Sequence, residues 1–345
     1  RDERQVTGYQ PSPFEELLND HMLNRDGAEH TRLRGLVSQA FTPKRIRELR
    51  PRAQSLANEL LDRVAQRGEM DLMADFAFHL PTIVILELLG VPSEDRDKFK
   101  LWSNALLAPT FSEAEQAQAI QHLQDFVGYL RALFEKRREE PQNDLVSALL
   151  QAEEGGDKLS ETELFGTFIL LIVAGHETTV NLIGNSMLAL WRNPEELERL
   201  RENPGLMPQA VEEFLRFDGS VERALSRWVA HDLEYRGHAM RRGDPVILIL
   251  GAANRDPSVF ENPERLEPSR DPNPHLGFGK GPHYCLGAPL ARLETEIALN
   301  TLLSRLPGLR PAVPLDALRY RMLPGFRGLE RFPVAWDAGD GSERG

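Results

Sequence analysis

The one cysteine of this 345-residue chain lies in a stretch suited to holding a thiolate. Cys285 has glycines around it at positions 279, 281 and 287, and a predicted helix, about residues 290–303, begins soon after it. Backbone N–H groups that converge near a helix N-terminus stabilise an anion, so they favour the thiolate. Glycines on both sides let a large flat ligand approach the backbone. A haem iron with a cysteine axial ligand requires such a loop.

Two other interpretations of Cys285 stay open on the residues alone. One is an inert buried cysteine beside a turn, and the other is the nucleophile of a cysteine hydrolase. A zinc site is excluded because one thiol is too few, and the chain has no C-x-x-C-H motif for covalent haem attachment.

A second chemical group interrupts an apolar helix predicted over residues 160–191. Ala174-Gly175-His176-Glu177-Thr178 places a carboxylate and a hydroxyl where burial is costly unless they serve a purpose. We expect Gly175 to let the helix widen, leaving room for a small molecule and water beside Thr178. A zincin motif would need a histidine at position 180, which is valine, and a solvated kink is the structural alternative.

Two charged pairs have helical spacing. Glu213 and Arg216 are three residues apart, and His30 and Arg34 are four apart, so each pair shares one helix face. The second pair could clamp carboxylates such as haem propionates. Taken alone, each of these spacings is more typical of an exposed helix surface than of a functional site.

The elements that must position these groups change in character along the chain. Residues from Pro13 to about Leu215 have mostly helical periodicity. Short β-like runs follow between Leu225 and Leu250, including a strand expected over residues 245–250. Residues 254–289 are rich in Pro and Gly without a period, and long irregular stretches are usually functional. The predicted fold class is mainly α with a smaller β region (α+β).

With these groups in this order, the chain resembles the cytochrome P450 superfamily of haem-thiolate monooxygenases, of the soluble bacterial type. Phe278 to Gly287 is similar to the family's cysteine-loop signature F-x-x-G-x-[HR]-x-C-x-G. Residues 174–178 look like its acid-alcohol motif, and residues 213–216 match its E-x-x-R. Asn254 to Pro257 and Phe260 also fit the family pattern. The segment before His30 is shorter than is usual for the family.

The resemblance implies a single cytochrome P450 domain over residues 1–345, with a long central helix over haem b. Cys285 would be the axial iron ligand, and Phe278 and Gly287 would belong to its haem-binding loop. His30, Arg34, Arg227 and His283 would hold the haem propionates. Ala174 and Gly175 would border the dioxygen site, and Glu177 and Thr178 would relay protons. The Glu213–Arg216 pair would bond to the irregular segment before the cysteine loop.

The implied reaction inserts one oxygen atom from dioxygen into an apolar small organic substrate, by hydroxylation or epoxidation. The pocket is expected near Leu170, Ala174, Val221, Leu225 and Phe326. No flavin or iron–sulfur module is visible, so electrons would come from a ferredoxin or flavodoxin with an NAD(P)H-dependent reductase. The alternatives are a peroxide-driven peroxygenase and a non-catalytic haem-thiolate sensor.

Charge and hydropathy narrow the location and the partners. The net charge of −12 argues against nucleic acid or an anionic membrane as a partner. The longest apolar run, residues 168–174, is far shorter than a membrane span, which takes roughly 18 residues. No secretory signal is visible, and a lone cysteine suits the reducing cytoplasm.

One basic stretch stands out from this acidic average. Residues 32–52 carry seven basic residues against one acid. We expect them to form a docking patch for an acidic ferredoxin or flavodoxin. The alternative is that these arginines are solvated, or pair internally with the protein's surplus acids.

Overall fold

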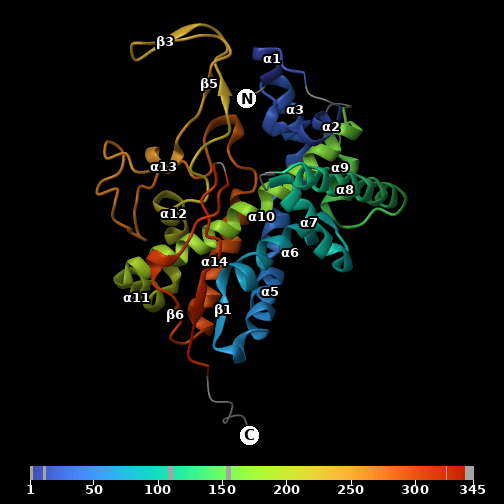
Figure 1. Ribbon diagram of the computed structural model, residues 1–345. Helices are drawn as coiled ribbons and strands as arrows, with labels where there is room; N and C mark the ends of the chain where they lie inside the picture. The colour runs from blue at the N-terminus through green and yellow to red at the C-terminus, as the bar shows by residue number, and fades with distance from the viewer. Residues whose placement is uncertain (1–2, 11–12, 108–111, 153–156, 324, 339–345) are drawn as a thin grey trace.

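A long helix, α10 (Glu161–Arg192), runs through the centre of the molecule (Figure 1). The computed structural model describes residues 3–10, 13–107, 112–152, 157–323 and 325–338. At the start of α10 the Ser160 hydroxyl accepts a hydrogen bond from the Glu163 N–H, and the Glu163 carboxylate accepts one from the Ser160 N–H. Most side chains of α10 are buried on every face, so other elements can pack all around it.

The other helices surround α10 or extend from its ends, and α2, α6, α12 and α14 pack directly against it. Their bounds are α1 Glu3–Thr7, α2 Pro13–Asn19, α3 Gly27–Ala40, α4 Pro43–Glu48, α5 Arg50–Asp62, α6 His79–Leu89, α7 Arg96–Leu107, α8 Glu113–Glu139, α9 Leu145–Gln151, α11 Pro194–Glu202, α12 Met207–Phe217, α13 Leu250–Ala253 and α14 Ala288–Arg305. A π-helical turn, Leu72–Ala77, leads into α6.

The strands are short and form three small antiparallel sheets among the described residues. β7 (Pro333–Ala335) lies between β1 (Glu69–Asp71) and β6 (Arg310–Pro311). β2 (Arg227–Trp228) pairs with β5 (Pro245–Val246), and β3 (Leu233–Tyr235) forms a hairpin with β4 (His238–Met240). Figure 1 shows β3 and β5 at one end of the molecule and β1 and β6 at the other.

The predicted fold class, mainly helical with a smaller β region, is confirmed, while two details were wrong. The strand expected over residues 245–250 covers only Pro245–Val246, because the chain turns into α13 at Leu250, whose N–H bonds to the carbonyl of Glu222 at 2.7 Å. β1 falls inside the stretch that the helical periodicity covered, and it exists because β7, from the other end of the chain, pairs with it.

Buried apolar side chains form one connected cluster that runs from Met22 to Trp336. Two helical segments within it, residues 72–89 and 161–192, are long and apolar enough to cross a membrane. Their most apolar windows are 61% and 78% buried inside the protein, as expected of core helices. Length and composition are therefore weak grounds for a membrane span here.

Candidate active site

The cysteine loop is folded tightly by its own backbone. The N–H of Cys285 donates to the carbonyl of Phe278 at 3.0 Å, and the N–H of Tyr284 donates to that of Gly281 at 2.9 Å. Gly279 and Gly281 have φ values of 71° and 78°, in the left-handed region that favours glycine. Cys285 therefore stands on a defined loop directly before α14.

Opposing effects act on the Cys285 thiol. Desolvation raises its pKa, whereas the N–H groups of Gly287 and Ala288 and the charges of Arg34 and Arg292 lower it. The net pKa lies above its ordinary value, because desolvation outweighs these donors. A metal ion that takes this sulfur as a ligand displaces the proton, and the same donors then stabilise the thiolate.

Charged side chains of α12 and α14 contact the cysteine loop and one another. The guanidinium of Arg292, on α14, lies over the Phe278 ring at 4.6 Å and binds both carboxylate oxygens of Glu212, on α12. His275 Nε2 also lies 2.9 Å from Glu212. These hydrogen bonds hold the pKa of Glu212 at about 2, although desolvation alone would raise it. Sequence reasoning missed Glu212 and Arg292, because a salt bridge between two helices leaves no local signal.

Of the four residues predicted to hold propionates, His283 and Arg227 interact with the carboxylate of Asp26, and His30 packs against His283. The rings of His30 and His283 lie 4.0 Å apart, and His283 Nε2 lies 2.9 Å from Oδ1 of Asp26. The charge of Asp26 also acts on Arg227. Arg34 is half-buried and forms no ion pair among the described residues, while its charge acts on Cys285. A group of imidazoles and guanidiniums that already binds one carboxylate has the chemistry to bind another.

The middle of α10 opens on one side. Ala174 is exposed, and Gly175 and Thr178 are partly so, within a helix that is otherwise mostly buried. The helix does not widen at Gly175 as expected. Glycine is required there because a Cβ would lie 2.9 Å from Cγ1 of Ile85, on α6. The glycine thus brings α6 and α10 close together and leaves the helix continuous.

The acid and the alcohol of α10 have different partners. The Thr178 hydroxyl donates to the Ala174 carbonyl at 3.1 Å. Oε1 of Glu177 accepts from Nη1 of Arg321 at 2.5 Å and from Nδ2 of Asn181 at 3.2 Å. His176, the variable position of the motif, is buried with Nδ1 2.7 Å from the Ile172 carbonyl, and burial lowers its pKa.

Neither Arg321 nor Asn181 was identified from the sequence. A buried asparagine four residues after Glu177 is a signal that could have been used. No such signal marks Arg321, because its partner, Glu177, lies far from it along the chain.

Glu213 and Arg216, on α12, form the most deeply buried ion pair of the described residues, with both side chains 0% exposed. Two hydrogen bonds of 2.7 Å join the side chains. Arg216 also donates to the carbonyls of Asn254, Pro263 and Arg265. Glu213 accepts from the Glu267 N–H and from the Arg270 and Asn273 side chains. The pair therefore anchors the irregular segment that leads to the cysteine loop.

The residues expected to line the pocket come from three parts of the chain. Val221 and Phe326 face each other in an isolated antiparallel bridge, Leu225 is 48% exposed, and Leu170 is buried in α10 one turn before Ala174. Leu248 and Ile249 are also about half exposed, at 46% and 49%. Apolar side chains that remain open to this extent suit contact with an apolar ligand.

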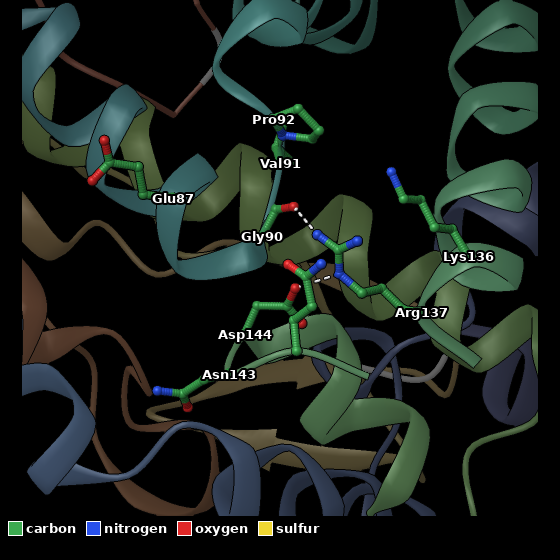
Figure 2. Close-up of a pocket in the computed structure, with 9 residues that line it drawn as sticks. Glu87, Gly90, Val91, Pro92, Lys136, Arg137, Asn143 and Asp144 are labelled. Atoms are coloured by element: carbon green, nitrogen blue, oxygen red, sulfur yellow. Dashed lines mark hydrogen bonds and ion pairs between the residues drawn. The ribbon is translucent and has the colours of Figure 1, made fainter. Parts of the chain in front are cut away.

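A polar cavity of about 520 Å³ lies elsewhere, between the ends of α6 and α8 and the start of α9 (Figure 2). Arg137 spans it, bonding to Asp144 at 2.5 Å and to the Gly90 carbonyl at 2.7 Å. Figure 2 shows the guanidinium held between these two partners. Glu87, Arg137 and Asp144 form ion pairs with other side chains, and none of the predicted active-site residues lines this cavity.

The basic stretch of residues 32–52 is largely neutralised. Four of its seven cations form ion pairs with carboxylates: Arg32 with Glu163 and Asp157, Lys44 with Glu48, Arg50 with Glu296, and Arg52 with Glu59 and Glu87. Arg45 bonds to the Ala40 carbonyl and to Asn143. Internal pairing, the alternative to a docking patch, therefore accounts for most of this charge, and Arg47 is the exposed cation that it leaves over.

Comparison with known proteins identifies the class. Residues 4–307 match the family model described as Cytochrome P450. The chain is 47% identical over 320 residues to the polyketide biosynthesis cytochrome P450 PksS of Bacillus subtilis, covering 93% of this chain and 78% of that protein. The solved structure of PksS superposes with a TM-score of 0.92 at 45% identity, covering 97% of this chain and 85% of that one. The chain belongs to the cytochrome P450 family.

Two further relatives carry names of reactions. The mycinamicin IV hydroxylase/epoxidase of Micromonospora griseorubida is 44% identical over 96% of this chain and 83% of its own length. The vitamin D(3) 25-hydroxylase of Pseudonocardia autotrophica is 46% identical over 91% of this chain and 77% of its own length. This chain is accordingly a cytochrome P450 monooxygenase of small organic substrates, and the family implies a haem cofactor.

Proposed function

We propose that the protein hydroxylates or epoxidises an apolar small organic molecule, with Cys285 as the ligand of haem iron. The observation that carries this proposal is the tight loop that presents the Cys285 sulfur to the N–H groups of Gly287 and Ala288. Half-exposed Leu225, Leu248 and Ile249 favour an apolar substrate. Bound haem supplies the iron at which dioxygen is activated.

We assign haem binding, the dioxygen site and proton transfer to residues of the chain itself. His30, Arg34, Arg227 and His283 hold the propionates, and Phe278 and Gly287 shape the loop under the ring. Ala174 and Gly175 border the dioxygen site. Thr178 holds water on the open face of α10, and Glu177 moves protons to it. A peroxide-driven enzyme has little use for such an acid-alcohol pair, which favours dioxygen as the co-substrate.

Electrons reach the haem from a separate ferredoxin or flavodoxin with its NAD(P)H-dependent reductase. We place the enzyme in the bacterial cytoplasm, consistent with its single cysteine and its bacterial relatives. One connected core from Met22 to Trp336 supports a single domain over residues 1–345.

The CO complex of the reduced protein tests the ligand. We expect the strongly red-shifted Soret band of thiolate ligation in the parent and its loss in Cys285→Ser, because the weaker hydroxyl donor cannot supply the same charge to the iron. Haem content, measured in parallel, separates loss of the ligand from loss of the cofactor. An unchanged spectrum in the variant would assign the iron to another residue.

A further inference from the structure

The stretch of chain between α12 and β2 is held by hydrogen bonds on both sides. The N–H of Arg223 donates to the Gly325 carbonyl at 3.3 Å. On the opposite side, the N–H of Ala224 donates to the Leu248 carbonyl at 2.9 Å. The C-terminal segment, residues 318–330, and the residues after β5 therefore fix this backbone, and with it the points from which its side chains start.

Two antiparallel bridges set the neighbours of Arg223. Arg223 lies opposite Ile249, and Val221 lies opposite Phe326. In both bridges the hydrogen bonds come from the residues on either side of the pair, so the two side chains of each pair lie close together on the same face. Ile249 is 49% exposed, and Leu225, two residues after Arg223, is 48% exposed. The side chain of Arg223 thus starts among apolar side chains that are open to contact.

The guanidinium of Arg223 has no carboxylate partner among the described residues. The side chain is exposed and forms neither an ion pair nor a hydrogen bond within that part of the chain. The adjacent carboxylate, that of Glu222, lies instead beside Arg327, with 3.7 Å between Oε1 and Nη1. A guanidinium with free donors next to apolar side chains has the chemistry to bind a carboxylate that is attached to an apolar body.

The location of Arg223 distinguishes it from the cations on exposed helix surfaces, which are usually just solvated. Arg223 lies between Val221 and Leu225, both of which are expected to line the substrate pocket. Gly325, on its other side, has no side chain, and a Cβ there would lie 3.9 Å from the Cβ of Arg223, an ordinary contact distance. No side chain therefore fills this position beside Arg223, which leaves space for a group of a ligand.

We propose that Arg223 is a specificity-determining residue that binds the carboxylate of an aliphatic carboxylic acid, whose chain lies against Val221, Leu225 and Ile249. The guanidinium offers parallel N–H donors that match the two oxygens of a carboxylate. An alcohol of the same chain length keeps the apolar contacts but lacks the charge. Holding the charged end of the substrate also limits which carbon of its chain is oxidised. This inference rests on the proposed function, because the acid occupies the same pocket.

The first test compares the binding of decanoic acid and decan-1-ol to the haem-loaded protein at neutral pH, by the haem spectral shift that each produces. We expect the parent to bind the acid more tightly than the alcohol. Arg223→Met should weaken acid binding by roughly tenfold and leave alcohol binding unchanged, because a charge-assisted hydrogen bond is lost. Arg223→Lys keeps a cation and should retain most of the preference. Arg241→Met, at an exposed arginine after β4, is the matched control and should behave as the parent does.

Several outcomes would overturn the inference. A parent that binds the alcohol as tightly as the acid, or does not bind the acid, has no carboxylate site. If Arg223→Met weakens both compounds alike, the residue shapes the pocket or holds the haem, which a parallel measurement of haem content distinguishes. Equal loss of preference in the Met and Lys variants would mean that charge is not what selects the acid. Arg223→Gln replaces the Met variant if the latter fails to fold.

A second measurement is the distribution of hydroxylated products from decanoic acid, with ferredoxin and its reductase supplying the electrons. The parent should oxidise a few neighbouring carbons, because its substrate is held at one end, and Arg223→Met should spread the products along the chain. Mass spectrometry of the products measures both, and identical distributions would overturn the inference.

Failure of the proposed function gives a different result from failure of this inference. If the function is wrong, the parent itself lacks the red-shifted Soret band of its CO complex. If only the role of Arg223 is wrong, that band is unchanged and only the discrimination between acid and alcohol is missing.

Discussion

Two buried glutamates each form an ion pair with an arginine, and the two arginines differ in exposure and in the number of their hydrogen-bond partners. Arg216 is 0% exposed and divides its hydrogen bonds between Glu213 and three backbone carbonyls, and it also lies over the Phe260 ring at 5.3 Å. Arg321 is 32% exposed and bonds to Glu177 alone. The first arginine joins α12 to the irregular segment, whereas the second touches one helix from a segment that solvent reaches.

The difference separates a structural pair from one that can change state. Releasing Arg216 would strand its charge and several carbonyls in the core, where both side chains of the pair are fully buried. Releasing Arg321 exposes a guanidinium that is already partly hydrated. The free-energy cost then comes from Glu177, which would stay buried without its cation. A side chain with one contact and one open side is therefore the better candidate for a moving part.

Glu294, on α14, shows a third way to bury a carboxylate. It is 0% exposed, and neither side-chain oxygen has a hydrogen-bond partner among the described residues. Desolvation raises its pKa well above the ordinary value, because burial disfavours the charged form. Burial therefore favours the protonated form of this carboxyl over an ion pair.

The largest effect that this comparison predicts is on stability. Arg216→Met should lower the free energy of unfolding by about 3–5 kcal/mol, because Glu213 stays buried without its main cation. Arg321→Met should cost about 1–3 kcal/mol, since water reaches the site. Urea unfolding at pH 7 measures both.

Arg138→Met, at an exposed pair with Glu135, is the control and should change stability by less than about 1 kcal/mol. If Arg216→Met cost no more than Arg321→Met, exposure and the number of contacts would not distinguish a structural pair from a movable one.

A second prediction concerns Glu212, the neighbour of Glu213 on the outer side of α12. Its pKa in the folded protein is about 2, below the ordinary 4.5, because its hydrogen bonds to Arg292 and His275 outweigh desolvation. A lowered carboxyl pKa contributes stability that is present above pH 4.5 and is lost as the pH falls toward 2. The shift corresponds to about 3 kcal/mol at neutral pH.

Comparing Glu212→Gln with the parent isolates this contribution from the other carboxylates. The parent should be more stable at pH 7, and the difference should shrink steadily between pH 5 and the lowest pH at which both proteins fold, as measured by chemical denaturation. A difference that stays constant with pH would show that Glu212 titrates alike in the folded and unfolded states.

Local patterns predicted the parts of the molecule that depend on neighbours in the chain. The helix predicted over residues 160–191 matches α10 within one residue at each end, and the Ser160–Glu163 bonds that fix its start form within one turn. The three-residue spacing of Glu213 and Arg216 predicted that they share a face. That spacing could not predict their burial, which comes from the irregular segment folding over α12.

Contacts between distant segments were beyond the sequence. Residues 247–249 are apolar yet about half exposed, so their hydrophobicity did not indicate a longer strand. The partner of Glu177 comes from the C-terminal segment, and no local signal marks Arg321 among the chain's many arginines. The sequence gives the net charge of residues 32–52 directly. It does not show the acids from outside this stretch that pair with its cations, which lie on α5, α6, α10, α14 and the segment before α10.

The smallest expected effect applies the same criterion to the surface. Arg50 and Arg52 are bound to carboxylates, whereas Arg47, at the end of α4, is exposed and has no ion pair among the described residues. If an acidic electron donor docks near the cysteine loop, Arg47 is the free charge of this stretch that can attract it. Arg47→Glu should slow reduction by ferredoxin roughly threefold at low salt and much less at high salt, because rim charges act on association and are screened. Stopped-flow reduction measures the rate.

Reduction by dithionite is the control without a protein partner. Arg138→Glu, on α8, is the control for a charge reversal elsewhere on the surface. Equal slowing by both reversals would assign the effect to net charge, and no slowing by Arg47→Glu would move the docking site away from α4.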